Sequence, residues 1–168
     1  MRIAFAAFLL AAFPACAETP VERGKYLVTI SGCNDCHTPG GLLGQPDPKR
    51  ILGGSDVGFG DPASGVWVGG NLTPDAETGL GKWTTDQIVA ALTKGETPQG
   101  RKLSEIMPWP ALSHLAPGDA QAIAAYLQSL PPVNNPTPGP FKAGETPTTP
   151  YVSTVIPTAD YMGLPRPK

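Results

Sequence analysis

The chain has 168 residues, enough for one ordinary domain and too few for two. Its formal charge is −2 and it contains no run of like charges, so the electrostatic footprint of nucleic-acid binding is absent. Its 20 glycines and 21 prolines bring the composition close to that of low-complexity chains. We therefore expect one small core surrounded by many loops.

The first 17 residues predict a cleaved signal peptide. A positively charged start precedes an apolar stretch at residues 3–13, which is too short to span a bilayer as a helix. Small residues at 15–17 form a cleavage pattern, so the mature chain should begin near Glu18 in the periplasm. A lipoprotein anchored at Cys16 is the alternative, although the residues before that cysteine match such a signal poorly. No membrane span is expected after cleavage.

Three helices are predicted from apolar spacing and from start and stop signals. Pro20 suits a first helical turn, and Gly32 suits a stop. Thr84 and Gln87 have the spacing of a capping box at the start of the second helix. The predicted helices cover residues 20–31, 84–95 and 117–130.

Glycine and proline divide the rest of the chain into loops. Residues 39–82 hold 12 of the 20 glycines, which favours turns, although residues 65–69 are compatible with a short strand of a small hairpin. Residues 131–168 contain 10 of the 21 prolines, which predicts an extended or disordered tail. The expected organisation is a signal peptide at 1–17, one domain at 18–132 and a proline-rich tail at 133–168.

Cys33, Cys36 and His37 form a Cys-x-x-Cys-His motif, the pattern of covalent haem attachment. Two cysteines three positions apart on a helical turn can form thioethers with the two vinyl groups of one porphyrin, and the adjacent histidine then lies under the iron. The alternatives are a thiol–disulfide centre, a zinc site and a structural disulfide. A thiol–disulfide centre usually follows a strand, whereas this motif follows a predicted helix. A zinc site would need two ligands besides the cysteines, and the mature chain offers only His114 besides His37. The motif therefore predicts one haem c.

Met107 is the expected distal ligand of the haem iron. It stands in the segment Met-Pro-Trp-Pro, where two prolines stiffen the backbone and prevent a continuous helix. The other methionine of the mature chain is Met162, in the proline-rich tail. His114 is a rival ligand, and an open distal site is a third possibility.

Four further side chains could reach the cofactor. Trp67, Trp83 and Trp109 could line the haem or donate an indole hydrogen bond to a propionate, but each also fits an ordinary core position. Asn71 could reach the haem too, although it is better explained as the cap of the turn at Thr73. None of them is assigned to the site.

At these motifs the chain resembles class I cytochromes c. More narrowly, it is similar to the cytochrome c subunits or domains that accept electrons from periplasmic alcohol, aldehyde and sugar dehydrogenases. The resemblance implies an all-α fold of three to four short helices around one haem, with Met107 as the distal ligand. It also implies that Gly24 allows a close crossing with the helix that carries Tyr126. The matching stretches lie at residues 24–27, 33–41, 71–75, 78–84, 107–110 and 124–132.

The expected function is that of an electron carrier rather than an enzyme. Six-coordinate iron leaves no open position for a substrate. The expected partners are a dehydrogenase as electron donor and a terminal oxidase or another cytochrome as acceptor. A haem enzyme or gas sensor with a vacant distal site is the rival, with His114 as the available acid–base group. The chain departs from many such subunits because it carries one haem motif rather than two or three.

Overall fold

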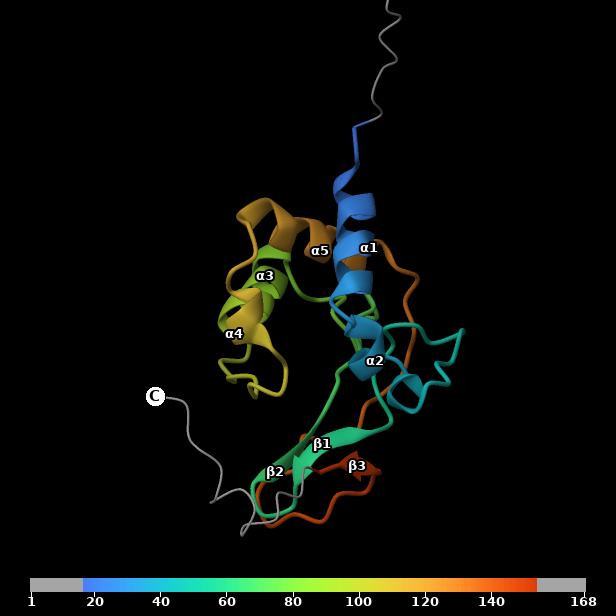
Figure 1. Ribbon diagram of the computed structural model, residues 1–168, viewed down its shortest axis with the longest axis vertical. Coiled ribbons are helices and arrows are strands. Elements are labelled where there is room, and N and C mark those ends of the chain that lie inside the picture. Colours follow the sequence, from blue (N-terminus) through green and yellow to red (C-terminus); the bar gives the residue numbers. More distant parts are fainter. Residues whose placement is uncertain (1–16, 154–168) are drawn as a thin grey trace, which may run out of the picture.

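The computed structural model describes residues 17–153. Figure 1 shows helices in the upper part of the molecule and a small sheet below them. In chain order the elements are α1 (Pro20–Ile30), α2 (Cys33–His37), the 3₁₀ turn η1 (Gly41–Leu43), β1 (Gly58–Asp61), β2 (Gly65–Val68), α3 (Thr85–Lys94), α4 (Trp109–Leu112), α5 (Pro117–Ser129) and β3 (Tyr151–Val152). No helix within the described residues is long and apolar enough to cross a membrane.

The first predicted helix is confirmed as α1. Its start is fixed by a capping box that the sequence analysis did not use. The Thr19 side chain accepts a hydrogen bond from the Glu22 amide at 3.2 Å, and the Glu22 carboxylate accepts one from the Thr19 amide at 2.9 Å. Two backbone donors at the helix start are thereby satisfied.

α1 crosses α5 at Gly24, as the resemblance implies. A Cβ atom at Gly24 would lie 2.6 Å from the carbonyl carbon of Ala122 and 2.7 Å from Cβ of Tyr126, so only glycine permits this approach. Beside the crossing, the Arg23 guanidinium donates two hydrogen bonds, of 2.9 and 3.2 Å, to the Asp119 carboxylate. The two ends of the helical domain are therefore joined directly.

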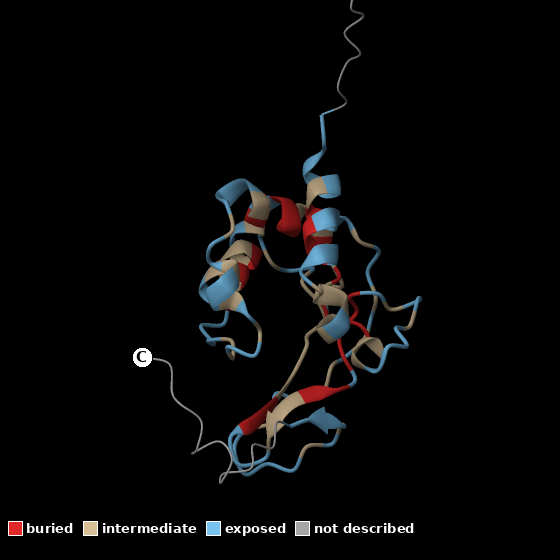
Figure 2. Ribbon diagram, viewed as in Figure 1, coloured by how far each residue is buried: buried red, intermediate tan, exposed pale blue. Residues whose placement is uncertain are grey.

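α3 and α5 confirm the other two predicted helices. α3 has the predicted capping box between Thr84 and Gln87, and it ends at Gly95 with a φ of 65°. Figure 2 shows buried residues where α1, α3 and α5 face one another. The buried hydrophobic cluster consists of Leu27, Val28, Leu52, Ile88, Leu92, Ile123, Ala124 and Leu127.

The structure contains a three-stranded sheet in addition to the helices, which the all-α expectation did not include. β1 and β2 form an antiparallel hairpin, in which Gly58 pairs with Val68 and Asp61 with Gly65. β3 adds to β1 in parallel, in the order β2-β1-β3. The possible strand at 65–69 is confirmed, but β1 was missed. Its sequence Gly-Phe-Gly-Asp has low strand propensity, so its pairing depends on tertiary contacts.

The first part of the predicted tail follows the surface as an extended segment and joins the sheet. Phe141 exchanges two backbone hydrogen bonds with Val66 of β2, of 2.8 and 2.9 Å. The segment then continues to β3. The residues of the predicted signal peptide up to Cys16, and residues 154–168 with Met162, lie outside the described residues.

Candidate functional site

A cavity of about 430 Å³ lies at the centre of the domain. Its lining comes from α1, α2, the β1–β2 hairpin, α3, α4, α5 and three loop segments, and Figure 1 shows these elements arranged around the middle of the molecule. Most of the lining side chains are apolar. They include Val28, Leu72, Leu80, Ile88, Leu92, Leu103, Leu112, Ile123 and Leu127. The cavity is therefore suited to a large, mainly apolar group.

Cys33 and Cys36 both line this cavity from the single turn of α2. Gly32 precedes that turn with a φ of 65°, a left-handed conformation that separates α2 from α1. Both thiols are free, and burial raises the pKa of each. A thiol–disulfide centre needs a lowered thiol pKa, so this environment does not favour that alternative.

His37 also lines the cavity, and its ring is oriented by a backbone carbonyl. Its Nδ1 atom lies 2.7 Å from the Gly70 oxygen, so Nδ1 carries the proton and donates it to this carbonyl. Desolvation lowers the pKa of His37 more than the hydrogen bond to Gly70 raises it. The ring is therefore neutral, with the lone pair on Nε2, which is the form that binds a metal.

The glycine-rich segment before β1 holds the backbone around His37. The Gly54 amide donates to the His37 carbonyl at 2.8 Å, and the Leu52 amide donates to the Thr38 hydroxyl at 2.9 Å. Leu52 is completely buried with a positive φ of 58°, a strained conformation for a non-glycine residue. No role for this segment was predicted from the sequence, and the structure shows that it supports the histidine.

Met107 lines the cavity from the segment that leads into α4. Its amide donates to the Ser104 carbonyl at 3.1 Å, and its own carbonyl accepts from the Trp109 amide at 2.7 Å. These bonds and Pro108 fix the backbone on both sides of the methionine. His114 is exposed and is not among the cavity-lining residues, so the structure does not bring the rival ligand to the site.

The tryptophans occupy different places. Trp67 and Trp83 line the cavity, whereas Trp109 packs elsewhere, with the Lys102 ammonium 4.3 Å from the centre of its ring. Asn71 takes the predicted turn role, because its side-chain oxygen accepts from the Thr73 amide and hydroxyl at 2.9 and 2.7 Å. It lines the cavity as well.

Arg101 is a lining residue that the sequence analysis missed. Among the described residues around the cavity, it has the one permanently charged side chain. Arg101 directly follows a turn at Gly100. It belongs to no motif, so no sequence signal distinguishes it from the other lysines and arginines. An arginine at the edge of an apolar cavity is suited to a carboxylate of the group bound there.

The donor set fits a covalently attached haem. Two thiols on one helical turn, a neutral imidazole and a thioether all line the same apolar cavity. Within residues 17–153, no group of three or more His, Cys, Asp or Glu residues could hold a metal ion.

The chain is similar to several known proteins. Residues 21–131 match the family described as Cytochrome c. The chain is 35% identical over 120 residues to the alcohol dehydrogenase (quinone) cytochrome c subunit of Gluconacetobacter polyoxogenes, covering 69% of this chain and 25% of that protein. It is 32% identical over 127 residues to the fructose dehydrogenase cytochrome subunit of Gluconobacter japonicus, covering 74% and 24%.

A third relative is the diheme cytochrome c-type of Cereibacter sphaeroides, which is 29% identical over 111 residues, covering 66% of this chain and 36% of that protein. The chain thus spans about a quarter of the length of the first curated relatives that it matches.

Proposed function

This chain belongs to the cytochrome c family, and from this premise we propose that it is a periplasmic carrier of single electrons with one haem c. Cys33 and Cys36 hold the haem through thioethers, and His37 and Met107 ligate its iron. The observation that carries the proposal is that these four side chains line one apolar cavity. The single Cys-x-x-Cys-His motif in the sequence supports one haem.

The bound haem supplies one-electron chemistry at its iron. The chain's own residues set the conditions for it. The Gly70 carbonyl keeps the His37 ring in one tautomer and orientation, with Nε2 free. The rigid segment around Met107 presents a soft thioether, which favours ferrous over ferric iron. The apolar lining excludes water and disfavours the extra positive charge of the oxidised state.

Arg101 gives the cavity one cationic partner for a haem carboxylate. A guanidinium can form two parallel hydrogen bonds with a carboxylate, which fixes orientation as well as charge. We include it in the haem-binding set with the four residues above.

The relatives suggest the electron donor. Two of the three named above are cytochrome subunits of an alcohol dehydrogenase and of a fructose dehydrogenase. We propose that this chain likewise takes electrons from a dehydrogenase and passes them to a terminal oxidase or another cytochrome. Its net charge of −2 suits a basic docking face on a partner.

The test is spectroscopic. The full chain is expressed in a bacterium with cytochrome c maturation enzymes and purified from the periplasm. Ferric and ferrous spectra are recorded with and without carbon monoxide for wild type, Met107→Ala and His114→Ala. We expect haem that survives denaturing electrophoresis, and a ferric methionine-to-iron charge-transfer band in wild type and His114→Ala. Met107→Ala should lose this band and bind carbon monoxide.

Three results would contradict the proposal. Protein without haem would refute it entirely. Carbon monoxide binding by wild type would favour the sensor or enzyme alternative. A spectrum that changes in His114→Ala but not in Met107→Ala would assign His114, and not Met107, as the distal ligand of the iron.

A further inference from the structure

The segment after α5 contributes to the cavity itself. Residues 137–140, Thr-Pro-Gly-Pro, line it together with Phe59 and Trp67 of the hairpin. The amide of the next residue, Phe141, donates a hydrogen bond to Val66 of β2, and its carbonyl accepts one from the Val66 amide. This stretch belongs to the proline-rich tail, yet it lies against the same space as the haem-binding residues. We call residues 133–141 the wall segment.

Buried and half-buried side chains anchor the start of the wall segment. The Asn71 amide group donates to the Val133 carbonyl at 2.7 Å and to the Thr78 hydroxyl at 3.0 Å. The Thr78 hydroxyl also accepts from the Asn135 amide at 3.0 Å. The Val133 amide in turn donates to the Thr73 hydroxyl at 3.1 Å. The wall segment thus supplies hydrogen-bond partners to Asn71, Thr73 and Thr78, in addition to the bonds that these side chains make within their own loop.

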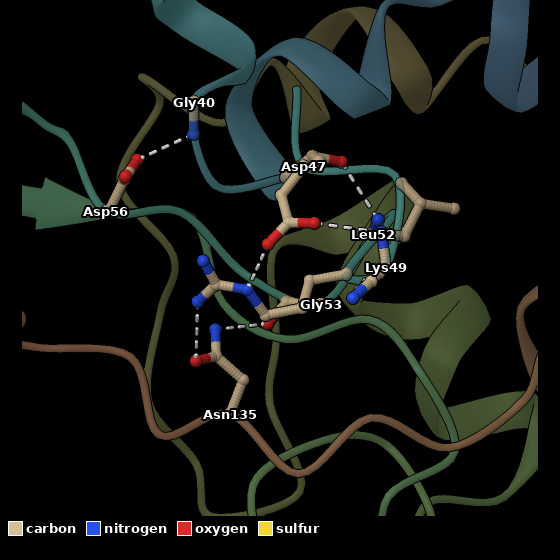
Figure 3. A network of polar contacts seen from close by, with 9 residues as sticks. Gly40, Asp47, Lys49, Leu52, Gly53, Asp56 and Asn135 are labelled. Atoms are coloured by element: carbon tan, nitrogen blue, oxygen red, sulfur yellow. Dashed lines mark hydrogen bonds and ion pairs between the residues drawn. The ribbon is translucent and has the colours of Figure 1, made fainter. Parts of the chain in front are cut away.

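A second anchor joins the wall segment to the glycine-rich loop before β1, as Figure 3 shows. The Asn135 side chain donates to the Gly53 carbonyl at 2.8 Å and accepts from the Arg50 guanidinium at 3.4 Å. Arg50 is held in turn by Asp47 at 2.7 Å. The neighbouring side chain, Asn134, is exposed and makes one hydrogen bond with Glu77 at 3.2 Å.

Each anchor includes a residue that is adjacent in sequence to a hydrogen-bond partner of His37. Asn71 directly follows Gly70, whose carbonyl accepts the hydrogen bond from the His37 ring. Gly53 directly precedes Gly54, whose amide donates to the His37 carbonyl. A Cβ at Gly54 would lie 3.2 Å from the Asn71 amide nitrogen and would overlap Thr137. The wall segment therefore packs on the two loops that orient the proximal ligand.

We propose that residues 133–141 form a wall of the haem cavity and that Thr78 and Asn71 are positioning residues that couple this wall to His37. The inference rests on the proposed function, since it concerns the haem bound in that cavity. The wall excludes water from one side of the haem and thereby raises the reduction potential.

The test uses full-length holoprotein with matched variants. Asn135→Ala removes the second anchor, and Asn134→Ala is the same change at the exposed neighbour. Thr78→Val removes the shared hydroxyl, and Thr78→Ser restores it. For each variant, haem content, midpoint potential, imidazole binding to the ferric form and hydrogen exchange of residues 133–141 are measured.

We expect Asn135→Ala and Thr78→Val to retain haem, to have lower midpoint potentials and to bind imidazole more tightly. Hydrogen exchange of the Phe141 amide should be at least about fivefold faster, because fivefold is the factor expected for the loss of one hydrogen bond. Asn134→Ala and Thr78→Ser should resemble wild type. If Thr78→Val does not fold, Asn135→Ala decides the question.

Unchanged potential and exchange in Asn135→Ala, with haem bound, would refute the wall but leave the proposed function standing. Faster hydrogen exchange without a change in midpoint potential would show that the segment has only a structural role. This result would also refute the proposal. Absence of haem from wild type would overturn both the proposed function and this inference.

Discussion

Gly69 leaves no space for a side chain beside Cys36: a Cβ atom there would lie 2.8 Å from the Cys36 carbonyl carbon and 3.3 Å from Nδ1 of His37. Gly69→Ala should therefore displace the haem motif and lower the free energy of unfolding by about 2–3 kcal/mol. It should also reduce haem incorporation in the cell.

Gly118→Ala is the control, because a Cβ at Gly118 meets no atom within 4 Å and Gly118 does not line the cavity. Chemical denaturation and the haem-to-protein ratio measure both variants. Equal losses in the two variants would show that backbone freedom, and not the contact with Cys36, explains the glycine at position 69.

Gly95 ends α3 and also packs against Trp109. Its φ is 65°, and a Cβ would lie 2.8 Å from three atoms of the indole ring. Gly100 has a similar φ of 75° but open space around it. Gly100→Ala should cost about 1 kcal/mol from backbone strain alone, and Gly95→Ala about 2–3 kcal/mol. Thermal or denaturant unfolding would give the difference, which measures the ring contact.

Arg101→Gln tests the cationic partner of the haem. Loss of a positive charge beside the haem stabilises the ferric state, so the midpoint potential should fall by an amount on the order of 50 mV at low salt. Lys25→Gln, on an exposed position of α1, is the control with the same change of charge. Equal shifts in both variants would mean that only net charge is being measured. Spectroelectrochemistry makes the comparison.

The Arg23–Asp119 pair makes stability depend on acid pH. The hydrogen bond from Arg23, aided by its charge, holds the pKa of Asp119 below its ordinary value. A lowered folded-state pKa stabilises the protein above the unfolded-state pKa, and this contribution is lost as the pH falls through the folded-state value. Asp119→Asn should therefore lose less stability than wild type between about pH 5 and about pH 2.

Denaturant unfolding at several pH values measures this dependence. Glu105→Gln is the control, since Glu105 is exposed and makes no hydrogen bond or ion pair with the residues that the structure describes. A wild-type pH dependence retained in Asp119→Asn would assign the acid sensitivity to other carboxylates.

The helices were predictable because their signals are local. The capping box at Thr84 and Gln87 and the glycine at position 95 lie within a few residues of the helix that they delimit. The haem motif is similarly contiguous, since its cysteines and histidine share one turn. Met107 could be proposed from its stiff proline surroundings, and it does line the cavity with the motif.

The rest of the site depends on contacts between distant segments. The Gly70 carbonyl that orients His37 is a backbone group, which any residue type would supply. β1 has no strand pattern of its own, and it forms because Val66 and Trp67 pair with it. Asn135 and Arg101 acquire their roles through neighbours far away in sequence. Such pairings leave no periodic signal in one sequence.

The anchors of the wall segment also bear on the order of events during folding. Asn135 and Gly53 are 82 positions apart, and Arg23 and Asp119 are 96 apart. The Asn135 contact cannot form until the chain has been synthesised beyond residue 135, so the cavity closes after the earlier segments that surround it have been made. Until then both motif thiols remain open to an attaching enzyme. A closed apoprotein would obstruct a rigid porphyrin, whereas a chain that closes last can fold around one already attached.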